Sequence, residues 1–185
     1  HEYLGVKCGL LDQIGSLMAR PGQVMLADFR DLDVTPVDVG LSNVSWVVLH
    51  SGVRRELAGS AYLERVQQCR EGLNSIKERN PDVRGMRDVA IPMLDKHQIV
   101  DRRLRHIVTE NQRVLDAVEA VRAGDASILG GILSAAHRSL RDDYEVSCPQ
   151  LDLLVELAED QSGCFGGRMV GGGFGGCTLN LVQTE

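Results

Sequence analysis

A run of glycines near the end of the chain constrains the fold more than any other feature. Residues 171–176 read Gly-Gly-Gly-Phe-Gly-Gly, and short apolar runs flank them at 167–170 and 177–182. Each flanking run is typical of a β-strand. Glycine suits a tight connection because it adopts positive φ at no steric cost. The sequence therefore predicts two strands joined by a glycine loop.

The same run matches G-x-G-x-x-G, the pattern of dinucleotide-binding folds. In those folds the pattern opens a helix whose N-terminus holds the pyrophosphate, whereas strand-like alternation follows Gly176 directly. We therefore exclude a dinucleotide site. Two interpretations remain open: a connection that binds nothing, or a loop whose backbone approaches a phosphate-bearing ligand.

Upstream of the glycines, apolar residues three and four positions apart indicate amphipathic helices. Strands are predicted at 24–29 and 46–49, with residues 31–43 as a polar connection between them. The fold class is therefore predicted to be α+β, a helix-rich layer beside a mostly antiparallel sheet. Predicted helices begin at Asp12 and otherwise cover residues 62–80, 97–123, 125–139 and about 149–160.

Several residues are predicted to begin, end or shape these helices. Gly124 fits a C-cap and Asp125 the N-cap of the next helix, while residues 147–150 fit a capping box. Gly130-Gly131 lies inside a predicted helix, where glycine is unfavourable, so we expect close helix packing there. The dense alternating charge of residues 137–147 is typical of a solvated helix end and loop.

Composition excludes several classes of function. The 185 residues carry 20 Lys and Arg against 26 Asp and Glu, for a net charge of −6, without a run of basic residues. A nucleic-acid partner needs a basic patch, so we expect none. No apolar stretch approaches the ~18 residues of a membrane-spanning helix, and the first residues lack signal-peptide features. We expect a cytoplasmic protein with no membrane partner.

Residue spacing also limits the chemistry. The cysteines are odd in number, widely spaced and free of C-x-x-C pairs, which is typical of reduced thiols. None of the five histidines is spaced from another histidine or a cysteine as metal ligands are, so we predict no metal site of that kind. No serine lies in G-x-S-x-G, the pattern of serine nucleophiles in acyl transfer. The cysteines are Cys8, Cys69, Cys148, Cys164 and Cys177.

A second local feature is a glycine followed three residues later by an aspartate, Gly9 and Asp12, at a predicted loop-to-helix junction. The spacing favours Asp12 as a helix N-cap. The alternative is a general base, because a carboxylate at the end of a loop can accept the proton of a substrate hydroxyl. The residues alone do not separate the two interpretations.

Four segments, in this order, resemble the galactokinases of the GHMP small-molecule kinase superfamily. The first runs from Cys8 to Gln13, and the second begins at Val53 and extends through Tyr62 and Arg65 to Cys69. The third reads Ser-Leu-Arg-Asp-Asp-Tyr-Glu-Val-Ser-Cys-Pro over 139–149, and the fourth covers 169–178 around the glycines. The resemblance covers nearly the whole chain.

The resemblance implies transfer of the ATP γ-phosphoryl group to the C1 hydroxyl of α-D-galactose. It implies that Asp12 is the general base, that Gly9 and Tyr62 contact the sugar with Asp12, and that Gly171, Gly172 and Gly173 shape the phosphate region. ATP and Mg²⁺ are the implied cofactors, with the metal ligands expected outside this sequence. The implied partner is a small sugar.

The implied fold is the end of an S5-like N-terminal domain, residues 1–45, joined to a ferredoxin-like C-terminal domain, residues 46–185. The family's N-terminal sugar motif and its Gly/Ser-rich ATP loop do not occur in the sequence. We therefore expect a fragment, truncated at both ends, that is inactive alone and prone to self-association, from a monomeric parent. The alternatives are a related kinase for arabinose or N-acetylgalactosamine, and a non-enzymatic galactose and ATP sensor on the same scaffold.

Overall fold

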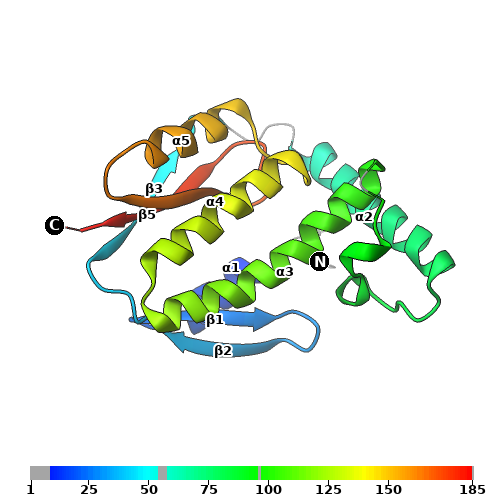
Figure 1. Cartoon of the computed structure of the whole chain (residues 1–185), viewed down its shortest axis with the longest axis horizontal. Coiled ribbons are helices and arrows are strands. Elements are labelled where there is room, and N and C mark those ends of the chain that lie inside the picture. Colours follow the sequence, from blue (N-terminus) through cyan, green and yellow to red (C-terminus); the bar gives the residue numbers. More distant parts are fainter. Residues whose placement is uncertain (1–8, 54–57, 96, 185) are drawn as a thin grey trace.

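The computed structural model of the chain describes residues 9–53, 58–95 and 97–184 (Figure 1). Cys8 and residues 54–57, which carry part of the family resemblance, lie outside the described residues. Helices and strands are mixed, so the predicted α+β class is confirmed. The elements are α1 (Leu11–Met18), β1 (Gln23–Asp28), β2 (Asp33–Asp38), β3 (Val44–His50), α2 (Ala58–Arg79), η1 (Met86–Asp88), η2 (Ile91–Met93), α3 (Ile99–Ala123), α4 (Ala126–Asp142), α5 (Pro149–Glu159), β4 (Cys164–Val170) and β5 (Cys177–Gln183).

Three strands form one antiparallel sheet in the order β3-β5-β4. Thr178 of the middle strand pairs with Leu49 on one side and Met169 on the other. The predicted pair of strands on either side of the glycines is therefore confirmed. In Figure 1 this sheet lies above α4, while α2 lies to the right of the helical layer.

A separate hairpin, β1–β2, corrects the prediction for residues 31–43. Residues 33–38 are not a polar connection but the second strand of an antiparallel pair. Pro36 in the run Asp-Val-Thr-Pro-Val-Asp argues against a strand, and a proline is tolerated here because β2 pairs on one side only. Val37 is buried, which gives the strand the apolar contact that its composition does not suggest.

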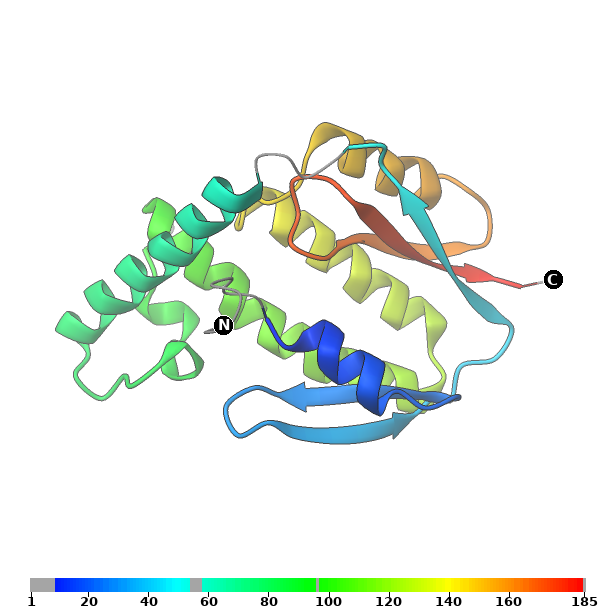
Figure 2. The same cartoon turned by 180° about the vertical axis from the view of Figure 1, so that it is seen from behind.

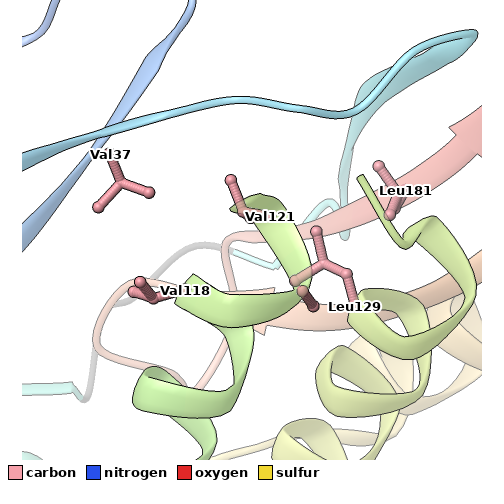
Figure 3. Packing of buried hydrophobic residues seen from close by; sticks show 6 residues of the cluster. Val37, Val118, Val121, Leu129 and Leu181 are labelled. Carbon is pink, nitrogen blue, oxygen red and sulfur yellow. The ribbon is translucent and has the colours of Figure 1, made fainter. Parts of the chain in front are cut away.

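The largest buried cluster joins the hairpin, the helices and the sheet. Figure 3 shows its labelled members pointing toward one another from β2, α3, α4 and β5. This shared core holds α3 and α4 between the hairpin and the sheet. The labelled residues are Val37, Val118, Val121, Leu129 and Leu181.

The junction between α3 and α4 forms as predicted. Gly124 is the C-cap of α3 with a φ of 70°, in the left-handed region. The Asp125 side chain accepts a hydrogen bond of 2.9 Å from the backbone N–H of Ile128. Both caps satisfy backbone groups that a helix end leaves unpaired.

The two adjacent glycines of α4 differ from each other. A Cβ on Gly130 would overlap the backbone carbonyl of Phe165, so this glycine allows α4 to approach β4. A Cβ on Gly131 would have no neighbour within 4 Å. The predicted reason for the pair, close packing, is confirmed for Gly130 and wrong for Gly131.

The capping box predicted at residues 147–150 is wrong. Cys148 occupies the N-cap position of α5, without a side-chain hydrogen bond to the helix, and Pro149 follows at its start. The Ser147 hydroxyl instead donates to the carboxylate of Asp152 at 2.5 Å. The capping box fails because the helix begins one residue later than that motif requires, so that Ser147 precedes the N-cap position.

Candidate active site

The β4–β5 connection needs its glycines. Gly171, Gly173, Gly175 and Gly176 have φ angles of 83°, 84°, 132° and 92°, in a region that side chains with a Cβ rarely adopt. Phe174 also has a positive φ, of 59°. Four of the six residues of the connection therefore use the conformational freedom that glycine provides.

Hydrogen bonds hold the connection at two places. The backbone N–H of Phe174 donates to the carbonyl of Val146 at 2.7 Å, which ties the connection to the turn after α4. The N–H of Gly176 donates to Val53 at 3.3 Å, and the N–H of Ser51 donates to Gly176 at 2.8 Å. The connection is therefore fixed between the ends of α4 and β3.

The first part of the connection leaves donors free. The backbone N–H groups of Gly171, Gly172 and Gly173 form no hydrogen bond with another described residue, and the space beside Gly172 is open. Successive N–H groups in such turn conformations form concavities that bind anions. The arrangement can therefore hold a phosphate oxygen.

Asp12 lies in the first turn of α1 and is exposed. The N-cap interpretation is wrong, because the helix begins at Leu11 and Leu10 occupies the N-cap position without a side-chain cap. The Gln13 amide fits as a donor to the carbonyls of Gly9 and Leu10, at 3.1 and 3.3 Å. The Asp12 carboxylate forms no hydrogen bond or ion pair with another described residue, so it is free to meet a ligand.

The predicted site residues lie on three separate elements. Tyr62 lies on α2 with 39% of its surface exposed, and Gly9 is exposed just before α1. Within the described part of the chain, no hydrogen bond or ion pair joins Tyr62, Asp12 and the glycine connection to one another. Figures 1 and 2 show α1 and the β4–β5 connection on the same face of the α3–α4 layer. The structure therefore places α1, which carries Asp12, and the β4–β5 connection on one face, without a direct bond between them.

The charged stretch at residues 137–147 was predicted to be a solvated helix end and loop. The structure shows that this prediction is wrong, because much of the stretch is buried or half-buried. His137 is 3% exposed, and its Nδ1 accepts a hydrogen bond of 3.3 Å from the N–H of Met169, just before the glycines. Its Nε2 lies 3.3 Å from Oδ1 of Asp152 but is poorly aligned for a hydrogen bond. Burial lowers the pKa of His137, which favours the neutral ring that this contact requires.

A second histidine, His106 of α3, is also buried. His106 on α3 forms a 3.0 Å hydrogen bond through Nδ1 with Ser139, whose hydroxyl donates to Asp143 at 3.0 Å. Burial lowers the pKa of His106 to about 4. The burial of these two histidines was not predicted from the sequence, although His137 and Ser139 share a helix with the buried Leu140.

The described residues do not supply a magnesium site. No group of three or more His, Cys, Asp or Glu side chains among them is placed to hold a metal ion. We therefore derive no step through Mg²⁺ from this chain. Among the described residues, no helix is both long and apolar enough to cross a membrane.

Comparison with known proteins shows what this chain is similar to. Residues 117–185 match the family model described as "GHMP kinases C terminal". The chain also superposes on the crystal structure of Lactococcus lactis galactokinase complexed with galactose, with a TM-score of 0.90 and 34% identity over 98% of this chain and 48% of that one. The chain therefore carries a GHMP kinase C-terminal domain over residues 117–185.

Along its full length, the chain is similar to galactokinases. It is 40% identical to the Roseiflexus sp. galactokinase, over 99% of this chain and 48% of that protein. It is 40% identical to the Homo sapiens galactokinase, over 100% of this chain and 47% of that protein. The chain therefore spans about half the length of the curated relatives it matches.

Proposed function

We propose that the protein carrying these residues is a galactokinase, which transfers the γ-phosphoryl group of ATP to the C1 hydroxyl of α-D-galactose. The observation that carries this proposal is the similarity to galactokinases over the whole chain, at about 40% identity. The agreement extends to the fold, since the Lactococcus lactis structure holds galactose and superposes over nearly all of this chain.

In this proposal Asp12 accepts the proton of the sugar hydroxyl. The hydroxyl oxygen attacks the γ-phosphorus, the bond to the β–γ bridging oxygen breaks, and ADP leaves. An exposed carboxylate with no partner among the described residues is available for this role. Its contribution is chiefly to orient the attacking oxygen, because positioning and charge stabilisation supply most of the rate in phosphoryl transfer.

The glycine connection is proposed to meet the phosphates. Gly171, Gly172 and Gly173 offer N–H groups that no other described residue accepts, and the open space beside Gly172 leaves room for a ligand to approach the backbone there. Tyr62 and Gly9 are proposed to contact the sugar. Mg²⁺ is proposed to be held by residues other than those described here.

We also propose the domain boundary near residue 45. The hairpin β1–β2 precedes this position, and β3 of the three-stranded sheet begins at Val44. Residues 1–45 would then complete an S5-like N-terminal domain, and 46–185 would form most of a ferredoxin-like one. For the complete protein we propose a cytoplasmic monomer that binds no nucleic acid.

The test is galactose-dependent ADP release by the complete gene product that carries this sequence. We expect turnover with galactose that exceeds turnover with arabinose or N-acetylgalactosamine, and little in Asp12→Asn. A preference for another sugar would refute the substrate. Tight binding of galactose and ATP with no turnover would refute the enzyme and indicate a sensor.

A further inference from the structure

Two buried arginines hold the turn after α4, residues 143–146, by its backbone carbonyls. Arg103 of α3 donates from Nη1 to the carbonyl of Asp143 at 2.5 Å. Arg65 of α2 donates from Nε to the carbonyl of Tyr144 at 2.9 Å and from Nη2 to that of Glu145 at 3.0 Å. Two guanidiniums, one from α2 and one from α3, thus bind three successive carbonyls.

The remaining donors of Arg103 are also paired. Its Nη2 lies 2.7 Å from Oε2 of Glu145, and its Nε donates to Oε1 of Gln68 at 2.8 Å. Arg102 contacts the other oxygen of Glu145 at 2.9 Å. The Arg103 side chain is 2% exposed, and a charge so deeply buried is tolerated only with this degree of pairing.

The turn itself adopts a conformation that needs support. Glu145 has a φ of 54°, in the left-handed region, which is unfavourable for a residue with a Cβ. Its two neighbours are tied back to α4, since Tyr144 N–H donates to Ser139 and Val146 N–H donates to Leu140. The carbonyl of Val146 then faces away from α4 toward the β4–β5 connection.

That carbonyl is where the turn meets the glycines. It accepts the 2.7 Å hydrogen bond from Phe174, and Phe174 packs against the buried cluster that contains Val146. A Cβ on Gly173 would lie 2.8 Å from the Cβ of Val146 and still closer to its carbonyl. With so little space between them, the connection follows any displacement of the turn.

We propose that Arg103 and Arg65 are positioning residues that fix the glycine connection through the 143–146 turn. They form no hydrogen bond or ion pair with a described residue of the connection, and they act by presenting the Val146 carbonyl to Phe174. Through that contact they set the direction of the free N–H groups of residues 171–173. The effect on phosphate binding rests on the proposed function, whereas the structural effect does not.

A conservative substitution separates positioning from general stability. In Arg103→Lys the charge remains, but one ammonium cannot reach Gln68, Asp143 and Glu145 together as the planar guanidinium does. Arg113→Lys is the matched control, because Arg113 is on the same helix, is 17% exposed and pairs with Glu110 at 2.7 Å without contacting the turn. Should Arg103→Lys fail to fold, Arg65→Lys removes two of the three carbonyl contacts and serves instead.

Hydrogen exchange on the complete gene product is the first measurement. In Arg103→Lys we expect exchange at the Phe174 amide to rise about tenfold more than exchange at the Leu181 amide in the middle strand, because the turn opens locally. In Arg113→Lys the two amides should change together. Equal acceleration of both amides in Arg103→Lys and Arg65→Lys would overturn the proposal and leave the arginines a purely structural role.

Steady-state kinetics on the complete gene product is the second measurement. We expect Arg103→Lys to raise the KM for ATP by about tenfold and to leave the KM for galactose within about twofold of the unsubstituted protein. An equal change in the KM for ATP and the KM for galactose would contradict the proposal that these arginines position the glycine connection. If the unsubstituted protein lacks galactose-dependent turnover, the proposed function fails, and the exchange comparison alone decides the positioning role.

Discussion

Replacing Gly130 by alanine should weaken the contact between α4 and β4. In the native chain the missing side chain allows the helix backbone to rest on Phe165. A Cβ at this position would lie 2.6 Å from the Cβ of Phe165 and would overlap its carbonyl. Gly131→Ala is the matched control, because the same added atom meets nothing within 4 Å there.

The two substitutions should change stability in opposite directions. An alanine in a helix interior is more favourable than glycine by ~1 kcal/mol, and Gly131→Ala should realise that gain. At Gly130 the added atom meets backbone, which cannot rotate away, so we take the upper end of the overpacking penalty, ~3 kcal/mol. The net loss is then ~2 kcal/mol, and the neighbouring positions differ by ~3 kcal/mol.

Thermal unfolding followed by circular dichroism measures the difference. For a chain of this length ~1 kcal/mol corresponds to ~2–4 °C in Tm, so Gly130→Ala should lower Tm by ~4–8 °C while Gly131→Ala raises it by ~2–4 °C. The mean residue ellipticity should match in both, because the helix itself persists. If Gly130→Ala proved as stable as Gly131→Ala, the close approach of α4 to β4 would be wrong.

Three further outcomes follow from the site and the core. Asp12→Asn in the complete gene product should leave Tm nearly unchanged, since the exposed carboxylate has no partner among the described residues, but should lower kcat at least ~100-fold; turnover like that of the unsubstituted protein would contradict the general base. Burial lowers the pKa of His106 from 6.5 to about 4. Between these two pH values the imidazole is protonated in the unfolded chain but neutral in the folded one, so the free energy of unfolding falls as the pH falls. The loss should be ~2 kcal/mol at pH 5, with a shallower pH dependence of urea unfolding in His106→Gln, and an unaltered profile would count against a buried neutral ring. Residues 1–185 alone should form no galactose 1-phosphate and should self-associate through exposed apolar side chains such as Leu17, which a turnover assay and light scattering would check.

The elements that the sequence predicted best are those with local causes. Helix α3 ends at Ala123 and α4 begins three residues later, because Gly124 and Asp125 supply the caps within the junction itself. The two strands on either side of the glycines likewise follow from their composition and from the turn between them. Such features need no knowledge of distant residues, so a pattern of spacing and caps is enough to find them.

The elements that the sequence missed depend on distant contacts. Strand β2 contains Pro36 and reads as polar, and its burial depends on α3, which packs against Val37 from about 80 positions further along the chain. The charges at 137–147 suggested solvent, yet Arg65 and Arg103 pair with the turn from α2 and α3. A charge pattern in one segment carries no information about which other segment will neutralise it.

The candidate site contains one part that local sequence determines and one part that depends on distant contacts. This difference decides which experiment tests the site most severely. The glycine connection is fixed by its own φ angles and by bonds to Val146 and Val53, so its shape is a property of this chain. Helix α1 has eight residues and no buried side chain, and Leu17 is 86% exposed. A helix so short is marginal on its own in water, so the distance between Asp12 and the connection depends on packing that local sequence does not encode. Loss of turnover in Asp12→Asn at unchanged stability would therefore test the assembled site, whereas changes at the glycines test only one part of it.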